Sequence, residues 1–89
     1  MGSERRYEIG FTKKAHKRYQ KLPKAVQLKL DLIAERWVTN PRTRTKGFKH
    51  LPGTNEYRCW VGLHHRVEWM VDDEARAVTI VAVGSREGM

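Results

Sequence analysis

Three strand-like runs separated by short turns make up most of the second half of the chain, and they constrain its fold most strongly. The runs extend from Glu56 to Val61, from His65 to Asp72 and from Ala77 to Gly84. They are rich in branched and aromatic side chains, and the first two alternate these with polar ones, as half-buried strands do. Because sequential strands joined by short turns pair antiparallel, we expect a three-stranded antiparallel meander.

The first half predicts one strand followed by two helices. Residues Tyr7 to Phe11 alternate as a half-buried strand, and Thr12 is a suitable N-cap for a short amphipathic helix from Lys13 to Leu22. A second helix is expected to carry Pro23 in its first turn and to end before Pro41, since the residue preceding a proline avoids the helical region. The sequence therefore predicts an α+β fold: an N-terminal strand, a two-helix hairpin and a three-stranded antiparallel meander, with the hairpin on one face of a curved sheet.

The two faces of the meander can be separated by counting alternate residues. If Val61 faces His65 across the first turn, one face is the core. It would consist of Tyr57, Cys59, Val61, Val67, Trp69, Val71, Val78, Ile80 and Ala82. The opposite face would carry Arg58, Trp60, Arg66, Glu68 and Met70, with Thr79, Val81 and Val83 from the last strand. This register places Trp60 opposite Arg66 and Arg58 opposite Glu68.

Two arginines and an indole on one open sheet face are suited to single-stranded RNA. Arginine binds phosphate in a bidentate manner, and an aromatic ring can stack on an unpaired base. Arg86 follows the last strand after Gly84, so its side chain could reach the same face. The alternative is structural: Arg58 would form an ion pair with Glu68, and Trp60 would carry Arg66 in a cation–π contact.

Basic residues are concentrated in the first half of the chain. Residues 1–50 contain 14 Lys or Arg and 4 acidic residues, whereas residues 51–89 contain 4 and 6, within a total net charge of +8. Residues 41–53 form a basic loop with Arg42, Arg44, Lys46, Lys49 and His50. Such a surface attracts a polyanion, either nucleic acid or an acidic protein, although a lysine-rich helix can also be merely a solvated face.

The length and the composition exclude several classes. Eighty-nine residues are enough for one domain, 1–89, in which Met1-Gly2-Ser3 has the appearance of a cloning remnant. A single cysteine, Cys59, excludes an internal disulfide, and the adjacent His64 and His65 would point to opposite faces of a strand, so we expect no metal site and no cofactor. The apolar runs are too short for a membrane span and the N-terminus lacks the apolar region of a signal peptide, which predicts a cytoplasmic protein.

The ordered set of motifs resembles the RelE/ParE superfamily of type II toxin–antitoxin toxins, from about residue 6 to residue 87. The motifs are Lys21-Leu22-Pro23, Asn40-Pro41, Lys49-His50-Leu51-Pro52-Gly53, Tyr57-Arg58, Val61-Gly62, His65-Arg66-Val67 and Val83-Gly84-Ser85-Arg86. The spacing from Gly62 to Arg66-Val67 and the closing Val-Gly-x-Arg carry most of the likeness. The resemblance implies a small basic toxin with a microbial-ribonuclease-like fold.

The resemblance to RelE-type members implies a metal-free ribonuclease that cuts mRNA in the ribosomal A site. Arg66 and Arg86 match the arginines that such members use on phosphate, and Arg58 matches a basic catalytic position. Lys46, Lys49, His50 and Trp60 are the expected RNA-binding residues. Trp60 stands where RelE has a lysine, and no tyrosine follows Arg86, so the general base and acid are open among Lys49, His50 and His65.

Two other functions remain open at this stage. ParE-type members share the scaffold and inhibit DNA gyrase, and a third possibility is a non-catalytic module that binds RNA or an antitoxin. The resemblance also implies a cognate acidic antitoxin, whose largely disordered segment would fold over the basic sheet face and form a toxin–antitoxin hetero-oligomer.

Overall fold

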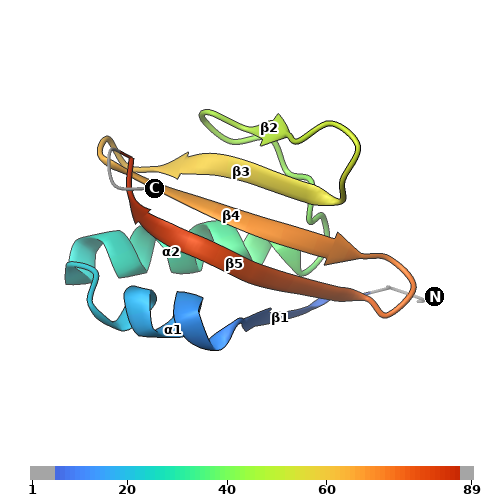
Figure 1. Ribbon diagram of the computed structural model, residues 1–89, viewed down its shortest axis with the longest axis horizontal. Coiled ribbons are helices and arrows are strands. Elements are labelled where there is room, and N and C mark those ends of the chain that lie inside the picture. Colours follow the sequence, from blue (N-terminus) through green and yellow to red (C-terminus); the bar gives the residue numbers. More distant parts are fainter. Residues whose placement is uncertain (1–5, 87–89) are drawn as a thin grey trace.

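The computed structural model describes residues 6–86, and its elements follow the predicted order (Figure 1). They are β1 (Glu8–Phe11), α1 (Lys13–Gln20), α2 (Lys24–Trp37), β2 (Lys49–His50), β3 (Glu56–Val61), β4 (His65–Asp72) and β5 (Ala77–Ser85). The Met1-Gly2-Ser3 segment lies outside the described residues. No helix in the described part of the chain is long and apolar enough to cross a bilayer.

The strands form one mixed sheet in the order β1-β5-β4-β3-β2. The predicted meander is confirmed, with β3 antiparallel to β4 and β4 antiparallel to β5, and Trp60 faces Arg66 as expected. The N-terminal strand β1 pairs parallel with β5. The basic loop was predicted without a strand, but Lys49 and His50 pair with Arg58 and Tyr57 on the free edge of β3. Two residues are too few to show a strand period.

The helix hairpin forms much as its caps predict. The amide of Ala15 donates to Oγ1 of Thr12 at 3.1 Å, which caps α1. The helix ends at Gln20 rather than at Leu22, and Pro23 precedes α2 as its N-cap instead of lying in its first turn. The last helical residue of α2 is Trp37, before Pro41 as expected. Figure 1 shows α2 behind the sheet and α1 beside β1 and β5.

The core lies between the sheet and α2. Its buried apolar residues are Tyr7, Ala15, Leu30, Trp37, Tyr57, Cys59, Val61, Val67, Trp69, Val71, Val78, Ile80 and Val83. Trp37 of α2 stacks on Trp69 of β4 with 4.4 Å between ring centroids. The indole N–H of Trp69 donates to the carbonyl of Pro41 at 2.9 Å, which fixes the start of the basic loop against the sheet. We expect this aromatic pair to contribute substantially to the core.

A β-bulge corrects the predicted faces of β5. Glu68 pairs with Ala82 but the next residue, Trp69, pairs with Ile80, so Val81 is the extra residue. Strict alternation breaks there: Val83 is buried in the core and Ala82 is only half-buried, the reverse of the prediction. Ala82 and Gly84 therefore lie opposite Glu68 and Arg66. We call the side of the sheet that carries Arg58, Trp60, Arg66, Glu68 and Met70 the open face.

Candidate functional site

A polar hollow of about 720 Å³ lies at one end of the open face. It is lined by Trp60, Leu63, His64, Arg66, Ser85 and Arg86. These residues come from the end of β3, the turn into β4, the start of β4 and the end of β5. The hollow therefore forms where the closing Val-Gly-x-Arg segment meets the first hairpin of the meander, and we call it the arginine hollow.

Arg86 lies flat over the indole of Trp60. Its guanidinium carbon is 3.7 Å from the ring centroid, and its Nη1 donates to the carbonyl of Leu63 at 2.8 Å. The backbone amide of Arg86 donates to the carbonyl of His64 at 2.8 Å. The predicted reach of Arg86 to this face is confirmed, and the indole carries Arg86 where the structural alternative expected Arg66. Such a stacked cation contributes about 0.5–2 kcal/mol and keeps its remaining N–H donors available.

The basic loop holds Trp60 from its other side. The amide of Trp60 donates to the carbonyl of Lys46 at 2.9 Å, and Nζ of Lys46 lies 5.6 Å from the ring centroid. A Cβ on Gly47 would lie 2.7 Å from the indole, and this glycine has a φ of +75°. Both observations require a residue without a side chain at position 47. The loop thus fixes the orientation of the ring on which Arg86 stacks.

Arg66 lies beside this pair with an unused donor. It faces Trp60 on β3 and Gly84 on β5. Its Nε is buried and has no hydrogen-bond partner among the described residues. The side chain of Arg66 is only half-buried and lines the hollow, so its guanidinium group is available to an anion there.

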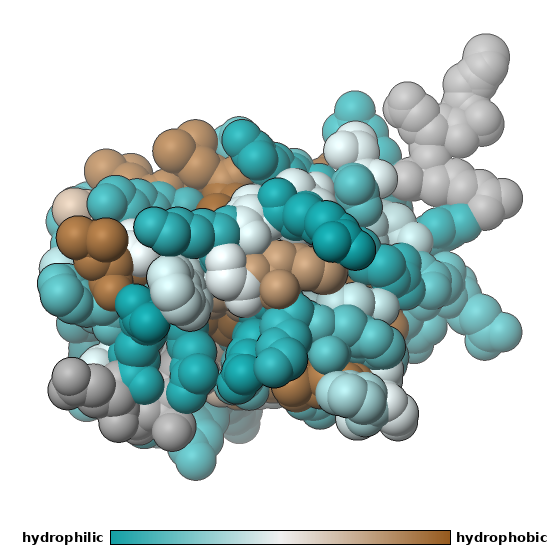
Figure 2. Space-filling view, turned by 90° about the horizontal axis from the view of Figure 1, so that it is seen from above, coloured by the Kyte–Doolittle hydropathy of each residue, from teal (hydrophilic) through white to brown (hydrophobic). Residues whose placement is uncertain are grey.

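Arg58 extends the basic surface toward the β2 edge. It faces Lys49 on one side and Glu68 on the other. Among residues 6–86 the one ion pair within 4.0 Å joins Arg42 to Asp73, so the ion pair between Arg58 and Glu68 that the structural alternative required does not form. Seen from the β2 edge, the surface is covered mostly by hydrophilic side chains (Figure 2).

The remaining candidate residues, which are Lys46 and three histidines, do not all lie near the arginine hollow. Lys46 is exposed beside Trp60, but His50 pairs with Tyr57 and stacks on its ring at 4.7 Å, so it lies on the opposite side of the sheet from Arg58. Its Nε2 is 2.6 Å from the carbonyl of Thr54. His65 is half-buried at the strand end. His64, which the sequence analysis considered only as a metal ligand, lines the arginine hollow. The position of His64 in the turn after Gly62 was the feature of the sequence that could have indicated its place at this site.

The remaining candidates for reactive groups are less favourable. Cys59 is fully buried, and burial raises the pKa of its thiol, which agrees with its predicted role as a small core residue. Within residues 6–86 no three His, Cys, Asp or Glu side chains are grouped so that they could hold a metal ion.

A second arginine cluster lies near the turn between β4 and β5. Arg42 donates from Nη2 to Asp73 at 2.8 Å and from Nε to the Tyr57 hydroxyl at 2.7 Å. The Tyr7 hydroxyl also donates to Asp73 at 2.7 Å, and Arg76 donates to that hydroxyl at 2.8 Å. The hydrogen bond from Arg42 lowers the pKa of Asp73, and the same bond raises the pKa of Arg42. These groups satisfy one another and join the residue before β1, the basic loop and the β4–β5 turn.

Comparison with solved structures agrees with this geometry. The chain superimposes on the archaeal RelE of the RelE–RelB complex from Pyrococcus horikoshii with a TM-score of 0.79 and 25% identity, covering 90% of this chain and 94% of that one. A mutant of the E. coli toxin RelE in the free state gives 0.79 and 25%, covering 93% and 86%. YoeB in the YoeB–YefM complex from Staphylococcus aureus gives 0.71 and 22%, covering 91% and 98%.

No family model matches the chain, and no curated protein sequence matches it either. The observed fold is nevertheless the fold that the order of the sequence motifs predicted. The chain has the fold of the RelE toxins, as the motifs predicted.

Proposed function

We propose that this protein is the toxin of a type II toxin–antitoxin system and that it acts as an endoribonuclease on mRNA in the ribosomal A site. The observation that supports the proposal most strongly is the arginine hollow. Arg66 and Arg86 line it together, Trp60 orients Arg86, and the Nε of Arg66 has no acceptor among the described residues. Two guanidinium groups, one of them held in place on an aromatic ring, match the charge and the geometry of a phosphodiester.

The reaction needs only groups that RNA and this face supply. The 2′-oxygen of one nucleotide attacks the adjacent phosphorus, the bond from phosphorus to the 5′-oxygen breaks, and the products are a 2′,3′-cyclic phosphate and a 5′-hydroxyl. Negative charge increases on the non-bridging oxygens as the phosphorus becomes five-coordinate. Arg66 and Arg86 would donate to these oxygens, and donors held in place before the reaction stabilise such charge most effectively. Arg58 would add positive charge along the strand.

A base must accept the proton of the 2′-hydroxyl, and an acid must protonate the departing 5′-oxygen. His64 lines the arginine hollow and is exposed, so it can reach a phosphodiester held there. Lys49 pairs with Arg58 at the other end of the basic surface. His50 is separated from the hollow by the sheet. We therefore assign the proton transfer at the hollow to His64, with Lys49 as a phosphate-binding residue.

An open site explains why the ribosome would be required. The hollow is wide for one phosphodiester, so it does not by itself fix the attacking 2′-hydroxyl in line with the leaving oxygen. In-line geometry is a large part of the rate of such reactions, so a scaffold that holds the mRNA would supply it. The net charge of +8 favours association with a ribosomal RNA surface, and the proposed substrate implies that the protein acts in the cytoplasm.

The same face would bind a cognate antitoxin. Several structural neighbours are toxins in complex with RelB or YefM. A basic surface of this kind suits an acidic segment that folds on binding and covers the arginines, so inhibition would be competitive. High salt should slow association if charge dominates this complex, and an unchanged association rate would indicate an apolar groove instead.

The test is to map mRNA ends after adding the purified protein to programmed ribosomes, with naked mRNA and a gyrase supercoiling reaction in parallel. We expect cleavage within the A-site codon on ribosomes, little cleavage of naked mRNA and normal supercoiling. Inhibited supercoiling without cleavage would contradict the proposal and indicate a gyrase inhibitor. Inactivity in all three reactions would indicate a binding module without catalysis.

A further inference from the structure

A second, smaller hollow lies on the open face next to α1. It has a volume of about 280 Å³ and is lined by Lys14, Ala15, Arg18, Glu68, Val81, Ala82 and Val83. It forms because β1 ends at Phe11, so α1 rather than a strand covers the second half of β5. The bulge at Val81 then places the small side chain of Ala82 opposite Glu68.

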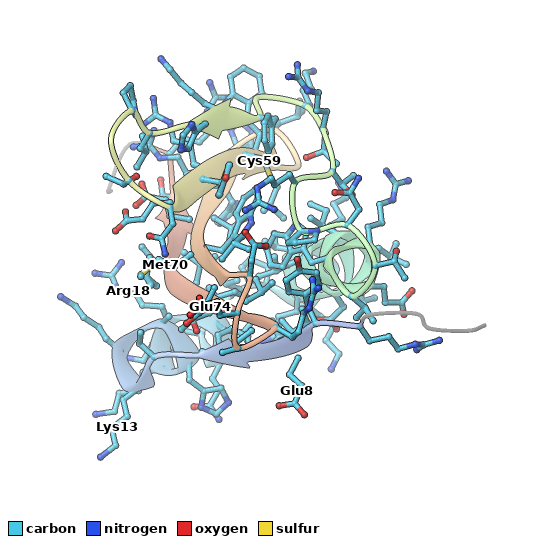
Figure 3. All side chains as sticks on the ribbon, turned by 90° about the vertical axis from the view of Figure 1, so that its right-hand side faces the viewer. Glu8, Lys13, Arg18, Cys59, Met70 and Glu74 are labelled. Carbon is cyan, nitrogen blue, oxygen red and sulfur yellow. The ribbon has the colours of Figure 1, made fainter. Side chains whose placement is uncertain are left out.

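The hollow is lined by two cationic side chains, an apolar floor and one carboxylate. Lys14 and Arg18 are four residues apart on α1, so they lie one turn apart on the same side of the helix, and both are exposed. The floor is apolar and consists of residues 81–83 with Ala15. In Figure 3, Arg18 and Met70 both lie on the side of the sheet away from α2, which is the open face.

Glu68 is the unexpected member of the set. It is a carboxylate in the middle of a basic face, between Arg66 and Met70 along β4. It faces Arg58 across the strands and shares the hollow with Lys14 and Arg18, yet it forms no ion pair within 4.0 Å among the described residues. A carboxylate here repels phosphate and an acidic peptide alike, and it accepts hydrogen bonds only. The groups of RNA that it can attract are the N–H donors of a base and the ribose hydroxyls, and of these only the N–H donors differ between bases.

We propose that this hollow is a nucleotide subsite in which Glu68 reads a base with an exocyclic amino group, while Lys14 and Arg18 hold the phosphate of the same nucleotide. Adenine, cytosine and guanine present an amino group at the edge that pairs in a duplex, whereas uracil presents two carbonyl oxygens and one N–H. A carboxylate is therefore attracted to the first three and repelled by the carbonyls of uracil. The apolar floor at residues 81–83 would support the flat base.

The subsite is continuous with the arginine hollow. Glu68 is two residues from Arg66 on the same side of β4, which corresponds to about 7 Å along a strand. One extended RNA strand can therefore place its cleaved phosphodiester at Arg66 and a neighbouring base at Glu68. This inference rests on the proposed function for its biological meaning, but binding of a nucleotide can be measured without ribosomes.

The direct test is an NMR titration of the ¹⁵N-labelled protein with cytidine 5′-monophosphate and, separately, with uridine 5′-monophosphate. We expect the cytidine nucleotide to shift the amides of residues 14–18 and 81–83 and to bind about 10-fold more tightly than the uridine nucleotide. Glu68→Gln, which keeps the shape and can donate as well as accept, should remove this difference. Equal affinity of the wild-type protein for the two nucleotides would overturn the proposal.

The two cations need a control for net charge. Replacing Lys14 and Arg18 together by Ala should weaken binding of both nucleotides about 10-fold or more, because each cation contacts the phosphate common to both. Replacing Lys24 and Arg36, two exposed residues of α2, by Ala changes the net charge equally and should leave the affinities unchanged. Equal losses in the two double variants would contradict a local phosphate site.

The outcomes for the two proposals are separable. Discrimination between the nucleotides without mRNA cleavage would retain the subsite and refute the ribonuclease. Cleavage on ribosomes by a protein that does not discriminate would retain the ribonuclease and refute the subsite.

Discussion

The two arginine clusters of this small protein differ in what surrounds them. Arg42 is engaged by Asp73 and by the Tyr57 hydroxyl, and these bonds hold the basic loop against the sheet. Arg66 and Arg86 form no ion pair within 4.0 Å among the described residues; one leaves its Nε without an acceptor and the other lies on Trp60. The first cluster is already neutralised, whereas the second has retained its charge.

This difference separates structural arginines from binding arginines. An arginine with a carboxylate and a hydroxyl as partners has little capacity left for a polyanion, and its removal costs stability. Guanidinium groups that are oriented by a ring and a backbone carbonyl retain donors and charge for a phosphodiester. The following changes test this contrast, beginning with the largest expected effect.

Arg86→Ala should lower the rate of mRNA cleavage on ribosomes by about 10³-fold, because it removes an oriented donor from the developing phosphorane charge. The core does not involve this side chain, so the midpoint of urea unfolding should change little. Arg86→Lys restores the charge without the planar stacking and should recover only part of the rate. Wild-type cleavage by the alanine variant would show that the hollow is not the site of reaction.

His64→Gln should lower the cleavage rate by about 10²-fold, since glutamine can form hydrogen bonds but cannot carry the proton between the two oxygens. Affinity for ribosomes should be unchanged, because the charge of the face is nearly the same. The matched control is His16→Gln on the exposed side of α1. Single-turnover cleavage measured across a range of pH distinguishes proton transfer by His64 from a merely structural role. If the variant is slower but the shape of its pH profile is unchanged, another group carries out the proton transfer.

Gly47→Ala should lower both stability and cleavage, by about 1 kcal/mol and about 10-fold, because the new Cβ meets the Trp60 ring and the φ of this residue is positive. Gly53→Ala is the control for the backbone effect, since its φ is +77° and a Cβ there has no neighbour within 4 Å. Equal loss of cleavage in both variants would show that the orientation of Trp60 is unimportant.

Asp73→Asn should destabilise the fold slightly at neutral pH, and the difference from the wild type should disappear in acid. The folded state lowers the pKa of Asp73 below its usual 3.8, so the carboxylate contributes stability above that value and the contribution is lost as the pH falls through the folded pKa. Urea unfolding at a series of pH values measures this. A difference that persists unchanged in acid would mean that the ionised carboxylate is not responsible.

The sequence predicted the open face because its signals were local and periodic. The alternation in β3 and β4 is regular, and the first turn is short, so the pairing of Trp60 with Arg66 followed from counting. The reach of Arg86 followed from the preceding Gly84. Trp60 and Arg66 lie in one hairpin and Arg86 is two residues from Gly84 in sequence, so local register determines where each residue lies.

The parts that the sequence could not predict depend on breaks in period or on distant contacts. The bulge at Val81 reverses Ala82 and Val83, and a run of small and branched apolar residues has no polar marker of such a shift. The side of the sheet on which His50 lies depends on a two-residue strand. The network of Tyr7, Arg42 and Asp73 joins three distant segments, and no pattern along the chain indicates that these residues meet.

The most direct measurement of the contrast is to compare Arg66→Ala with Arg42→Ala in two assays, mRNA cleavage on programmed ribosomes and urea unfolding. We predict that Arg66→Ala lowers cleavage by about 10³-fold and leaves the stability near that of the wild type, whereas Arg42→Ala lowers the stability by about 1 kcal/mol and leaves cleavage by the folded protein nearly unchanged. Full cleavage by Arg66→Ala, or loss of cleavage in a stable Arg42→Ala protein, would contradict the account.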